Sequence, residues 1–534
     1  MTNQKTQNLF SNVLLFGMLV LFLGCNAPKE ESYDATGTLK EYVSYFNQME
    51  EEGVVNHISN EESYSWLEKN IPLFEAPDST LEQTYYYRWW TFRKHLKKTP
   101  EGFVFTEFIR PVSHAGKYNT VSCALGHHVY EGRWLHDDKF IDEYILFWLI
   151  RDQYAENPQA HKYSSWLADA VYHRYLVNKD EVFVSSLVDE LNQDYRQWHR
   201  EKGLSNGLYW QYDVRDGMEE SISGSRTDKN ARPTINSYMY GNAVALANLS
   251  DLIGRDSLQE AYQNKASRLK QLVREELWDS DAQFFKAQLE DGTLSDAREA
   301  IGFIPWYFDL PADKENFARA WDQLEDPQGF LAPCGLTTAE RRHPEFRTHG
   351  TGECEWDGAV WPFATTQTLK GMAKLLTGYS NHSVQKEDYF EVLKTYANSH
   401  EKNGKPYIGE YLDGKTGEWL KGDNPRSRYY NHSGFADLII NDLIGLKPQP
   451  GDSVVVKPLI PEGKWDWFLL DNVKYHDRIL IIQWDKTGEK YGNGQGLRIF
   501  ADGEQIYQSD TLKPATCELP GASDAHPVQQ VGMK

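Results

Sequence analysis

Residues 352–362 of the chain read Gly-Glu-Cys-Glu-Trp-Asp-Gly-Ala-Val-Trp-Pro. Acidic and indole side chains are packed together in this loop, and its final proline opens a helix that apolar spacing predicts over 361–376. Rigid aromatic faces beside carboxylates suit a sugar, whose apolar ring face stacks on an indole while its hydroxyls take polar partners. We expect four of these side chains to contact a carbohydrate: Glu355, Trp356, Asp357 and Trp361.

A second acidic cluster lies upstream, where residues 215–221 read Arg-Asp-Gly-Met-Glu-Glu-Ser directly after the aromatic run 208–212. No lysine stands three or four residues from these acids, where it could form ion pairs with them on a helix, and a glycine interrupts any helix. Glycoside cleavage needs one protonated carboxyl for the leaving oxygen and a second carboxylate to activate water. The cluster therefore offers candidates for one of these two carboxyls in Asp216, Glu219 and Glu220, with Trp210 as a substrate contact. The alternative for an isolated acid triplet is a solvated turn.

A candidate for the second carboxylate follows in residues 405–419, Lys-Pro-Tyr-Ile-Gly-Glu-Tyr-Leu-Asp-Gly-Lys-Thr-Gly-Glu-Trp. Glu410 stands there in a short extended piece, flanked by tyrosines and followed by a turn. Residues 429–434, Tyr-Tyr-Asn-His-Ser-Gly, come shortly after it and contribute Tyr430 and His432 as further substrate contacts. Glu410 is thus the natural partner for the acidic cluster.

Another aromatic stretch has a less specific meaning. Residues 85–90, Tyr-Tyr-Tyr-Arg-Trp-Trp, continue to Phe-Thr-Glu-Phe at 105–108 and form either core packing or a sugar-binding wall. We expect Arg88 and Trp89 to contact substrate, since an arginine is hard to bury without a purpose.

The adjacent pair His127 and His128 suggests a metal site at first sight. Neighbours on a helix point about 100° apart, however, and no spaced third ligand follows them. We therefore expect no metal and no cofactor.

Three of these motifs occur in the order known from one family. Residues 356–362 resemble the Trp-Arg-Gly-Pro-Val-Trp signature of the six-hairpin glycosidases, the (α/α)6 toroid clan that includes trehalase, processing α-glucosidase I and mannosylglycerate hydrolases. Residues 217–221 resemble the Gly-Met-Asp-Asn-Ser motif that carries the clan's general acid. Residues 410–417 resemble its Glu-Asn-Tyr-Asp and Thr-Gly base motif.

The resemblance extends over roughly residues 79–446 and implies hydrolysis with inversion. It assigns the acid to Glu219, the base to Glu410 and the subsite walls to the two indoles of the signature. A glutamate stands where the common pattern has an aspartate, and this longer side chain leaves Asp216 as a competitor for the acid role. Asp357 stands where the pattern has an arginine, which implies a glycone unlike that of the α-glucosidases.

Helical periodicity dominates the chain as far as about residue 445. After residues 448–451, Pro-Gln-Pro-Gly, the pattern changes to period two in β-branched runs. Together with the resemblance, this predicts an all-α (α/α)6 toroid as catalytic domain at 36–447 and a small C-terminal β-sandwich at 448–534. The helices that we expect are 39–49, 81–96, 140–153, 164–176, 181–200, 238–253, 258–277, 314–322, 361–376 and 385–400.

The N-terminal segment has the character of a secretion signal. Residues 1–24 have an apolar core too short for a membrane span, and Leu-Phe-Leu-Gly-Cys at 21–25 resembles a bacterial lipobox. Cys25 would then carry the lipid, and residues 25–35 would form a charged tether like the export signals of Bacteroidetes surface lipoproteins. We expect a lipid-anchored protein of the outer membrane, facing either the periplasm or the cell surface.

The composition narrows the class of ligand. A net charge of −22 argues against nucleic acid, whose phosphates need basic partners. Seventeen tryptophans and 31 tyrosines in so polar a chain favour a carbohydrate. We expect an oligosaccharide or polysaccharide as the partner, and a membrane only through the lipid anchor.

Two other functions are compatible with these motifs. One is a glycan-binding lipoprotein without catalysis, which needs the aromatic residues but no matched acid and base. The other is a polysaccharide lyase on an α/α toroid, which uses Tyr, His and Arg and keeps Tyr430 and His432 of interest. Within the hydrolases, an arabinofuranosidase, a rhamnosidase, an α-glucosidase and an α-mannosidase all fit the sequence.

Overall fold

The computed structural model describes residues 35–152, 158–312 and 316–521. The predicted signal segment and Cys25 lie outside the described residues. None of the helices in the described ranges is both long and apolar enough to cross a membrane.

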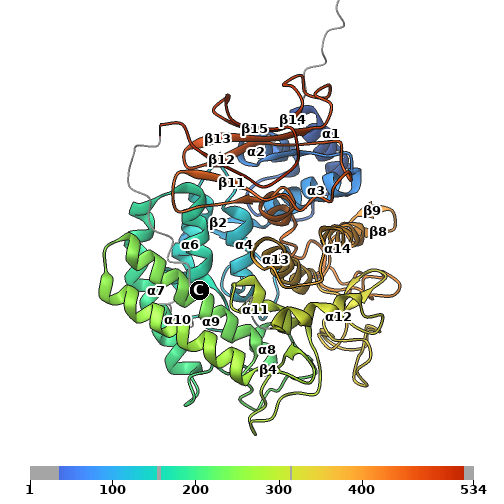
Figure 1. The fold of residues 1–534 in the computed structure, drawn as a ribbon. Coiled ribbons are helices and arrows are strands. Elements are labelled where there is room, and N and C mark those ends of the chain that lie inside the picture. The colour runs from blue at the N-terminus through green and yellow to red at the C-terminus, as the bar shows by residue number, and fades with distance from the viewer. Residues whose placement is uncertain (1–34, 153–157, 313–315, 522–534) are drawn as a thin grey trace, which may run out of the picture. The chain divides into compact units, whose positions relative to one another are not determined.

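Helices are the main regular structure of the chain up to residue 445 (Figure 1). The helices are α1 (Ala35–Gln48), α2 (Asn60–Asn70), α3 (Ser79–His95), α4 (Leu125–Gly132), α5 (Lys139–Leu146), α6 (Leu167–Asn178), α7 (Glu181–Lys202), α8 (Asp213–Asp216), α9 (Pro233–Leu252), α10 (Asp256–Glu276), α11 (Ile304–Tyr307), α12 (Asp322–Glu325), α13 (Pro362–Gly378), α14 (Lys386–Ser399) and α15 (Phe435–Asp437).

These helices close into a ring. Along the ring α4 contacts α6, α6 contacts α9, α9 contacts α11 and α11 contacts α13. From there α13 contacts α14, α14 contacts α3, and α15 joins α3 back to α4. Helices α7 and α10 lie outside α9, so the long helices α3, α9 and α13 are covered on most sides. Their side chains are accordingly buried almost all round, including polar ones.

Local signals in the sequence account for the helix ends. Asp78 caps α3 by accepting hydrogen bonds from the next backbone amides, and Ser59 and Glu62 form a capping box on α2. Proline opens both α9 and α13, where the missing amide proton costs nothing. The predicted helix at 314–322 differs from the structure, in which Asn316–Trp321 is a 3-10 helix leading into α12.

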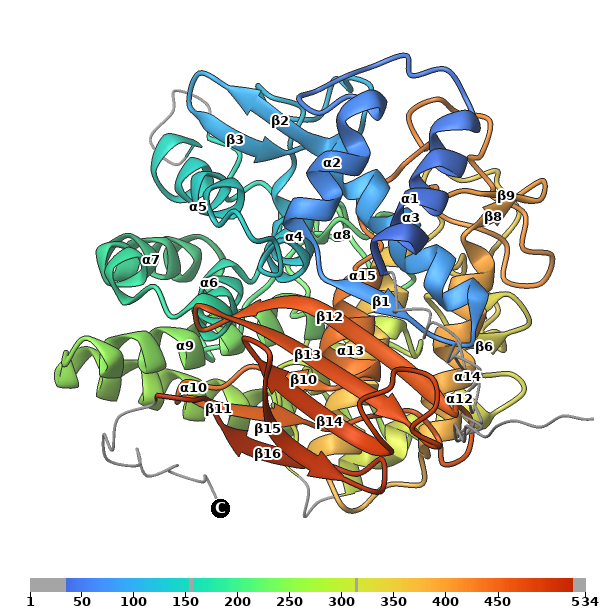
Figure 2. The same ribbon diagram turned by 90° about the horizontal axis from the view of Figure 1, so that it is seen from above.

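The C-terminal part forms two antiparallel sheets (Figure 2). The five-stranded sheet has the order β1, β12, β13, β14, β15, and the three-stranded sheet has the order β10, β11, β16. Strand β1 comes from the N-terminal region between α2 and α3, where Leu73 pairs with Asp471. The strands are β1 (Leu73–Glu75), β10 (Leu446–Lys447), β11 (Ser453–Val456), β12 (Trp467–Tyr475), β13 (Arg478–Asp485), β14 (Gly496–Ala501), β15 (Glu504–Ser509) and β16 (Ala515–Glu518).

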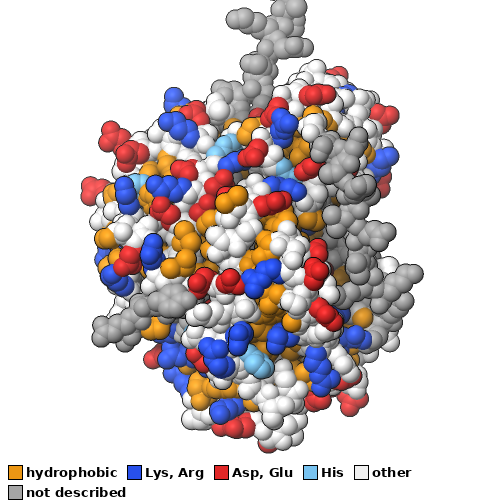
Figure 3. Space-filling view, turned by 90° about the vertical axis from the view of Figure 1, so that its left-hand side faces the viewer, with side chains coloured by type: hydrophobic (Ala, Val, Ile, Leu, Met, Phe, Trp, Pro, Cys, Tyr) orange, Lys and Arg blue, Asp and Glu red, His pale blue; other side chains and the backbone are white. Residues whose placement is uncertain are grey.

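Short two-stranded ribbons connect the helices. They are β2 (Leu96–Thr99) with β3 (Gly102–Phe105), β4 (Trp278–Asp279) with β5 (Phe284–Phe285), β6 (Leu331–Ala332) with β7 (Gly335–Leu336), and β8 (Glu401–Lys402) with β9 (Lys405–Pro406). Figure 3 shows one face of the molecule, on which basic, acidic and apolar side chains are interspersed despite the negative net charge.

Candidate active site

The acidic cluster lies on the loop that follows α8. Gly217 has φ +71°, a conformation that favours glycine, and a Cβ at this position would lie 3.2 Å from the Cβ of Cys123. The glycine therefore allows the chain to turn closely over Cys123. This turn presents the next carboxylates, Glu219 and Glu220, away from the short helix.

Residues 213–220 contain four carboxylates, and the protein already binds three of them. Asp216 pairs with Arg232 at 2.7 Å, and both side chains are fully buried. Glu220 pairs with Arg347 at 2.7 Å and accepts hydrogen bonds from the amides of residues 353, 354 and 355. Asp213 accepts a hydrogen bond from the amide of Glu220 at 3.0 Å. These three acids hold the loop in shape.

Glu219 differs from its neighbours because no ion pair or side-chain hydrogen bond to its carboxyl is found among the described residues. Burial raises the pKa of Glu219 to about 7, and the nearby charges of Asp213 and Glu107 raise it further. A half-buried carboxyl with this pKa holds a proton near neutral pH and can donate it. The pairing of Asp216 with Arg232 thus favours Glu219 over Asp216 as the proton donor.

Glu410 follows the β8–β9 ribbon and is buried with 3 % of its surface exposed. One guanidinium nitrogen of Arg426 lies 3.0 and 3.1 Å from the two carboxyl oxygens of Glu410. Burial raises the pKa of Glu410, while Arg426 acts in the opposite direction and favours the carboxylate. Arg426, which our sequence interpretation did not identify, therefore supports a charged base at this position.

Glu219 and Glu410 interact electrostatically with the same two residues, Cys354 and Glu107. Burial raises the pKa of the Cys354 thiol, and the charges of both glutamates raise it further. The charge of Glu107 likewise raises the pKa of Glu219 and that of Glu410. Both predicted catalytic carboxyls therefore lie close to the same two residues.

A stack of three aromatic rings connects the two carboxylate segments. Trp356 stacks on Trp361 with centroids 4.7 Å apart, and Trp361 stacks on Tyr411 at 4.8 Å. The amide of Trp356 donates to the carbonyl of Glu219, and Tyr411 directly follows Glu410. The predicted walls Trp356 and Trp361 are thus joined to the two chain segments that carry Glu219 and Glu410, although their rings are buried against each other.

Glu355 and Asp357 support the loop that carries these indoles. The fully buried carboxylate of Glu355 accepts hydrogen bonds from the backbone amides of residues 349, 350 and 352. Asp357 pairs with Arg347 at 2.8 Å, and burial raises its pKa to about 6. Arg347 thereby links Asp357 to Glu220. The bonds within the protein occupy Glu355, which speaks against direct sugar binding by this residue.

Arg88 and Trp89 occupy the core of α3. Arg88 is buried and forms an ion pair and hydrogen bonds with the buried Glu131. Trp89 is fully buried against Tyr85 and Phe92. Complete burial speaks against the substrate contacts that we expected, because the ring of helices covers both faces of α3.

The remaining predicted contacts have different surroundings. Trp210 is half-buried, packs on Tyr212 and carries the ammonium of Lys202 over its ring at 4.0 Å. His128 binds the carbonyl of Asn431 and the hydroxyl of Tyr144 and is therefore structural.

Tyr430 and His432 meet two residues that our sequence interpretation did not select, Glu107 and Cys123. Tyr430 donates a hydrogen bond to Glu107 at 3.0 Å, and the Nε2 atom of His432 lies 3.2 Å from the same carboxylate. The thiol of Cys123 lies 3.6 Å from the other oxygen of Glu107. Only the placement of Glu107 beside phenylalanines in the sequence could have drawn attention to it.

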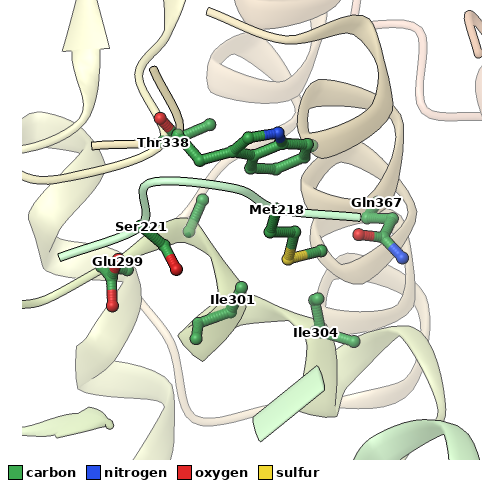
Figure 4. A pocket seen from close by; sticks show the side chains of 10 residues that line it. Met218, Ser221, Glu299, Ile301, Ile304, Thr338 and Gln367 are labelled. Atoms are coloured by element: carbon green, nitrogen blue, oxygen red, sulfur yellow. The ribbon is translucent and has the colours of Figure 1, made fainter. Parts of the chain in front are cut away.

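A small cavity lies beside the acidic loop (Figure 4). Met218 and Ser221 line it together with Ile301, Ile304 and Gln367. Neither Glu219 nor Glu410 borders this cavity, so it is not the place of the predicted reaction.

Comparison with known families gives two matches along the chain. The model of the mannosylglycerate hydrolase MGH1-like glycoside hydrolase domain matches residues 117–433. The model of the glycosyl hydrolase family 65 C-terminal domain matches residues 447–507, which contain most strands of the two C-terminal sheets.

Several solved structures are similar to this chain. A structure named "Sialidase" is 50% identical with a TM-score of 0.88, over 91% of this chain and 45% of that protein. The chain thus spans less than half the length of that protein. A GH63 mannosylglycerate hydrolase from Thermus thermophilus in complex with glucose is 15% identical with a TM-score of 0.51, over 66% of this chain and 98% of its own.

A GH78 family rhamnosidase of Bacillus sp. GL1 is 11% identical with a TM-score of 0.57, over 78% of this chain and 40% of its own. At such identities the likeness concerns the fold alone. The comparisons confirm the predicted fold class, an (α/α)6 toroid with a β-rich C-terminal module.

Proposed function

This chain belongs to the mannosylglycerate hydrolase MGH1-like glycoside hydrolase family, and on that premise we propose that it cleaves terminal glycosidic bonds of oligo- or polysaccharides with inversion. Glu219 serves as the general acid and Glu410 as the general base. The observation that carries this proposal is the difference among the acids of the 213–220 loop: Glu219 alone is left without a binding partner in the described structure, with its pKa raised to about 7.

The reaction follows from the two environments. The protonated Glu219 donates to the glycosidic oxygen as the bond to the anomeric carbon breaks. Glu410, whose charged form is favoured by Arg426, removes a proton from a water that attacks the opposite face of the sugar. The water oxygen bonds to the anomeric carbon, and its configuration is inverted.

Two observations support a hydrolase over the rival functions. A glycan-binding protein has no use for a carboxyl held protonated beside a second carboxylate. A lyase needs a tyrosine free to act on the uronic acid, whereas the hydroxyl of Tyr430 donates to Glu107. The name of the 50% identical structure does not assign the glycone, because this chain covers under half of that protein.

The proposal is tested with nitrophenyl glycosides and plant polysaccharides, including arabinofuranosides, rhamnosides, α-glucosides and α-mannosides. Nuclear magnetic resonance of the first product gives its anomeric configuration. We expect an inverted product and a loss of about 10²-fold or more in kcat for Glu219→Gln and for Glu410→Gln. A retained configuration, or glycan binding without hydrolysis by the unchanged protein, would overturn it.

We also propose that Cys25 is lipidated and anchors the protein to the outer membrane. Mass spectrometry of the mature N-terminus checks this point. A free N-terminus at another residue would contradict it.

A further inference from the structure

Three side chains with different donor atoms converge beside the proposed active site. Glu107 follows strand β3, Cys123 lies in the 3-10 turn Ser122–Ala124 before α4, and His432 lies in the loop before α15. One donor atom from each side chain lies within 4.8 Å of the other two. All three residues are buried, with 3, 5 and 2 % of their surfaces exposed. We propose that Glu107, Cys123 and His432 bind a divalent cation of the zinc class.

The donor atoms of the three side chains are close enough to share one ion. Cys123 Sγ lies 3.6 Å from Glu107 Oε2, and His432 Nε2 lies 3.2 Å from Glu107 Oε1. Tetrahedral zinc separates a sulfur from an oxygen by about 3.5 Å and a nitrogen from an oxygen by about 3.3 Å, so binding through one oxygen requires the Glu107 carboxylate to turn that oxygen toward both neighbours. The carboxylate, thiolate and imidazole set also suits this borderline-soft ion better than calcium or magnesium.

The second observation concerns His432 itself. The Nδ1 atom of this buried histidine has no hydrogen-bond partner within the described structure, and Nε2 contacts only the carboxylate of Glu107. Leaving a buried polar atom without a partner is costly. A cation bound at Nε2 would be shared with that carboxylate and would leave Nδ1 for a water or a substrate hydroxyl.

The charges around the buried Glu107 carboxylate also favour a bound cation. Among the described residues, Glu107 has no lysine or arginine as ion-pair partner, and His432 is its only basic contact. A buried carboxylate without a full counter-charge is costly, and a divalent ion provides that charge. Cys123 would bind as the thiolate, releasing its proton to solvent when the metal enters.

The protein holds the three ligands rigidly. Tyr430 donates to Glu107 Oε1 at 3.0 Å, which orients the carboxylate as outer partners of metal ligands do. The amide of Asn431 donates to the carbonyl of Glu107, and the side chain of Asn431 donates to the carbonyl of Thr106. The loop with His432 is therefore attached to the segment with Glu107 whether or not an ion is present.

Three protein ligands leave one tetrahedral position for a water or a sugar hydroxyl. The site adjoins the proposed acid, because Gly217 packs on Cys123 two residues before Glu219. Metal binding itself is measured without substrate. A failure of this inference is therefore distinguishable from a failure of the glycosidase reaction.

The test uses the purified full chain, dialysed against metal-free buffer. Elemental analysis should find about one zinc per chain. After removal of the metal with a chelator, Co²⁺ alone should restore the site and give a thiolate-to-cobalt charge-transfer band with the visible absorption of tetrahedral cobalt. If the unchanged protein holds no metal and gives no such spectrum with Co²⁺, the proposal is overturned, whatever the variants do.

Single cysteine-to-serine variants identify which thiolate binds the metal. Cys123→Ser should abolish the charge-transfer band, whereas Cys517→Ser, in the β module, should leave it unchanged. Cys354→Ser should also retain it, and loss of the band in this variant instead would contradict the assignment. Tyr430→Phe should keep the band but weaken metal affinity by about 10-fold or more, as expected for a partner that orients a ligand.

Discussion

Arg232 and Asp216 form an ion pair at 2.7 Å in which neither side chain is exposed to solvent. Glu219, three residues after Asp216, has no such partner among the described residues. The two acids of one loop should therefore respond differently to substitution.

Asp216→Asn should mainly reduce stability. Removing one partner of a buried ion pair leaves the charge of Arg232 uncompensated and costs about 3–5 kcal/mol. Glu219→Gln should leave the fold intact and lower kcat about 10²- to 10⁴-fold, because it removes the proton donor. Denaturant unfolding and steady-state kinetics on both variants separate the two effects. Normal stability of Asp216→Asn with complete loss of activity would return the acid role to Asp216.

The pH profile should have an alkaline limb set by Glu219. Its pKa is raised to about 7, so the donor is lost as pH rises through that value. A divalent cation at Glu107, Cys123 and His432 would move this limb to lower pH, since a nearby positive charge favours the carboxylate. The kcat/KM profile should therefore be measured before and after chelator treatment.

The same shift predicts an effect on stability. The folded state keeps the proton of Glu219 up to about pH 7, whereas the unfolded chain releases it near its ordinary pKa of 4.5. Stability therefore falls as pH rises between these values and stays reduced above them. Glu219→Gln should be more stable than the unchanged protein at pH 8 and equally stable at pH 4. Equal stability at both pH values would show that the carboxyl is ordinary.

Arg426→Gln should move the acidic limb of the profile to higher pH. Without the guanidinium, the burial of Glu410 raises its pKa unopposed, so the base is protonated over more of the range. Arg426→Lys should restore part of the activity by restoring the charge. Arg428→Gln provides a matched control two residues away, since Arg428 pairs with Glu50. An identical change in both glutamine variants would argue against a specific role for Arg426.

Arg347→Gln should loosen the loop that carries Trp356. Arg347 bonds to Glu220 at 2.7 Å and to Asp357 at 2.8 Å, and both contacts are partly exposed. We expect a loss of stability of about 1 kcal/mol and a larger effect on KM than on kcat. Arg342→Gln, which removes a pair with Asp326, is the control. A fall in kcat with unchanged KM would place Arg347 in the chemical step instead.

The sequence predicted the helical body, the β-rich C-terminal part and the two acid-bearing motifs because each is a local pattern. It could not distinguish the loop acids from one another. Asp216 is paired by Arg232 and Glu220 by Arg347, and the approach of both arginines is set by tertiary structure. The stripe with Arg88 and Trp89 misled for a related reason: a helix covered on most sides buries its polar face as well as its apolar one.

The convergence of Glu107, Cys123 and His432, and the pairing of Arg426 with Glu410, were also invisible to spacing arguments. These residues come from separate loops, and only the closed ring of helices brings them together.

The pairing of β1 with β12 has a consequence for biosynthesis. Leu73 is made early and Asp471 late, so the five-stranded sheet can be completed only when most of the chain has been synthesised. Contacts between such distant segments form slowly, because a long stretch of chain must be ordered before they are made. Until then β1 and its neighbours remain exposed to wrong partners. We expect truncation before residue 467 to yield an aggregating product rather than an active shorter enzyme.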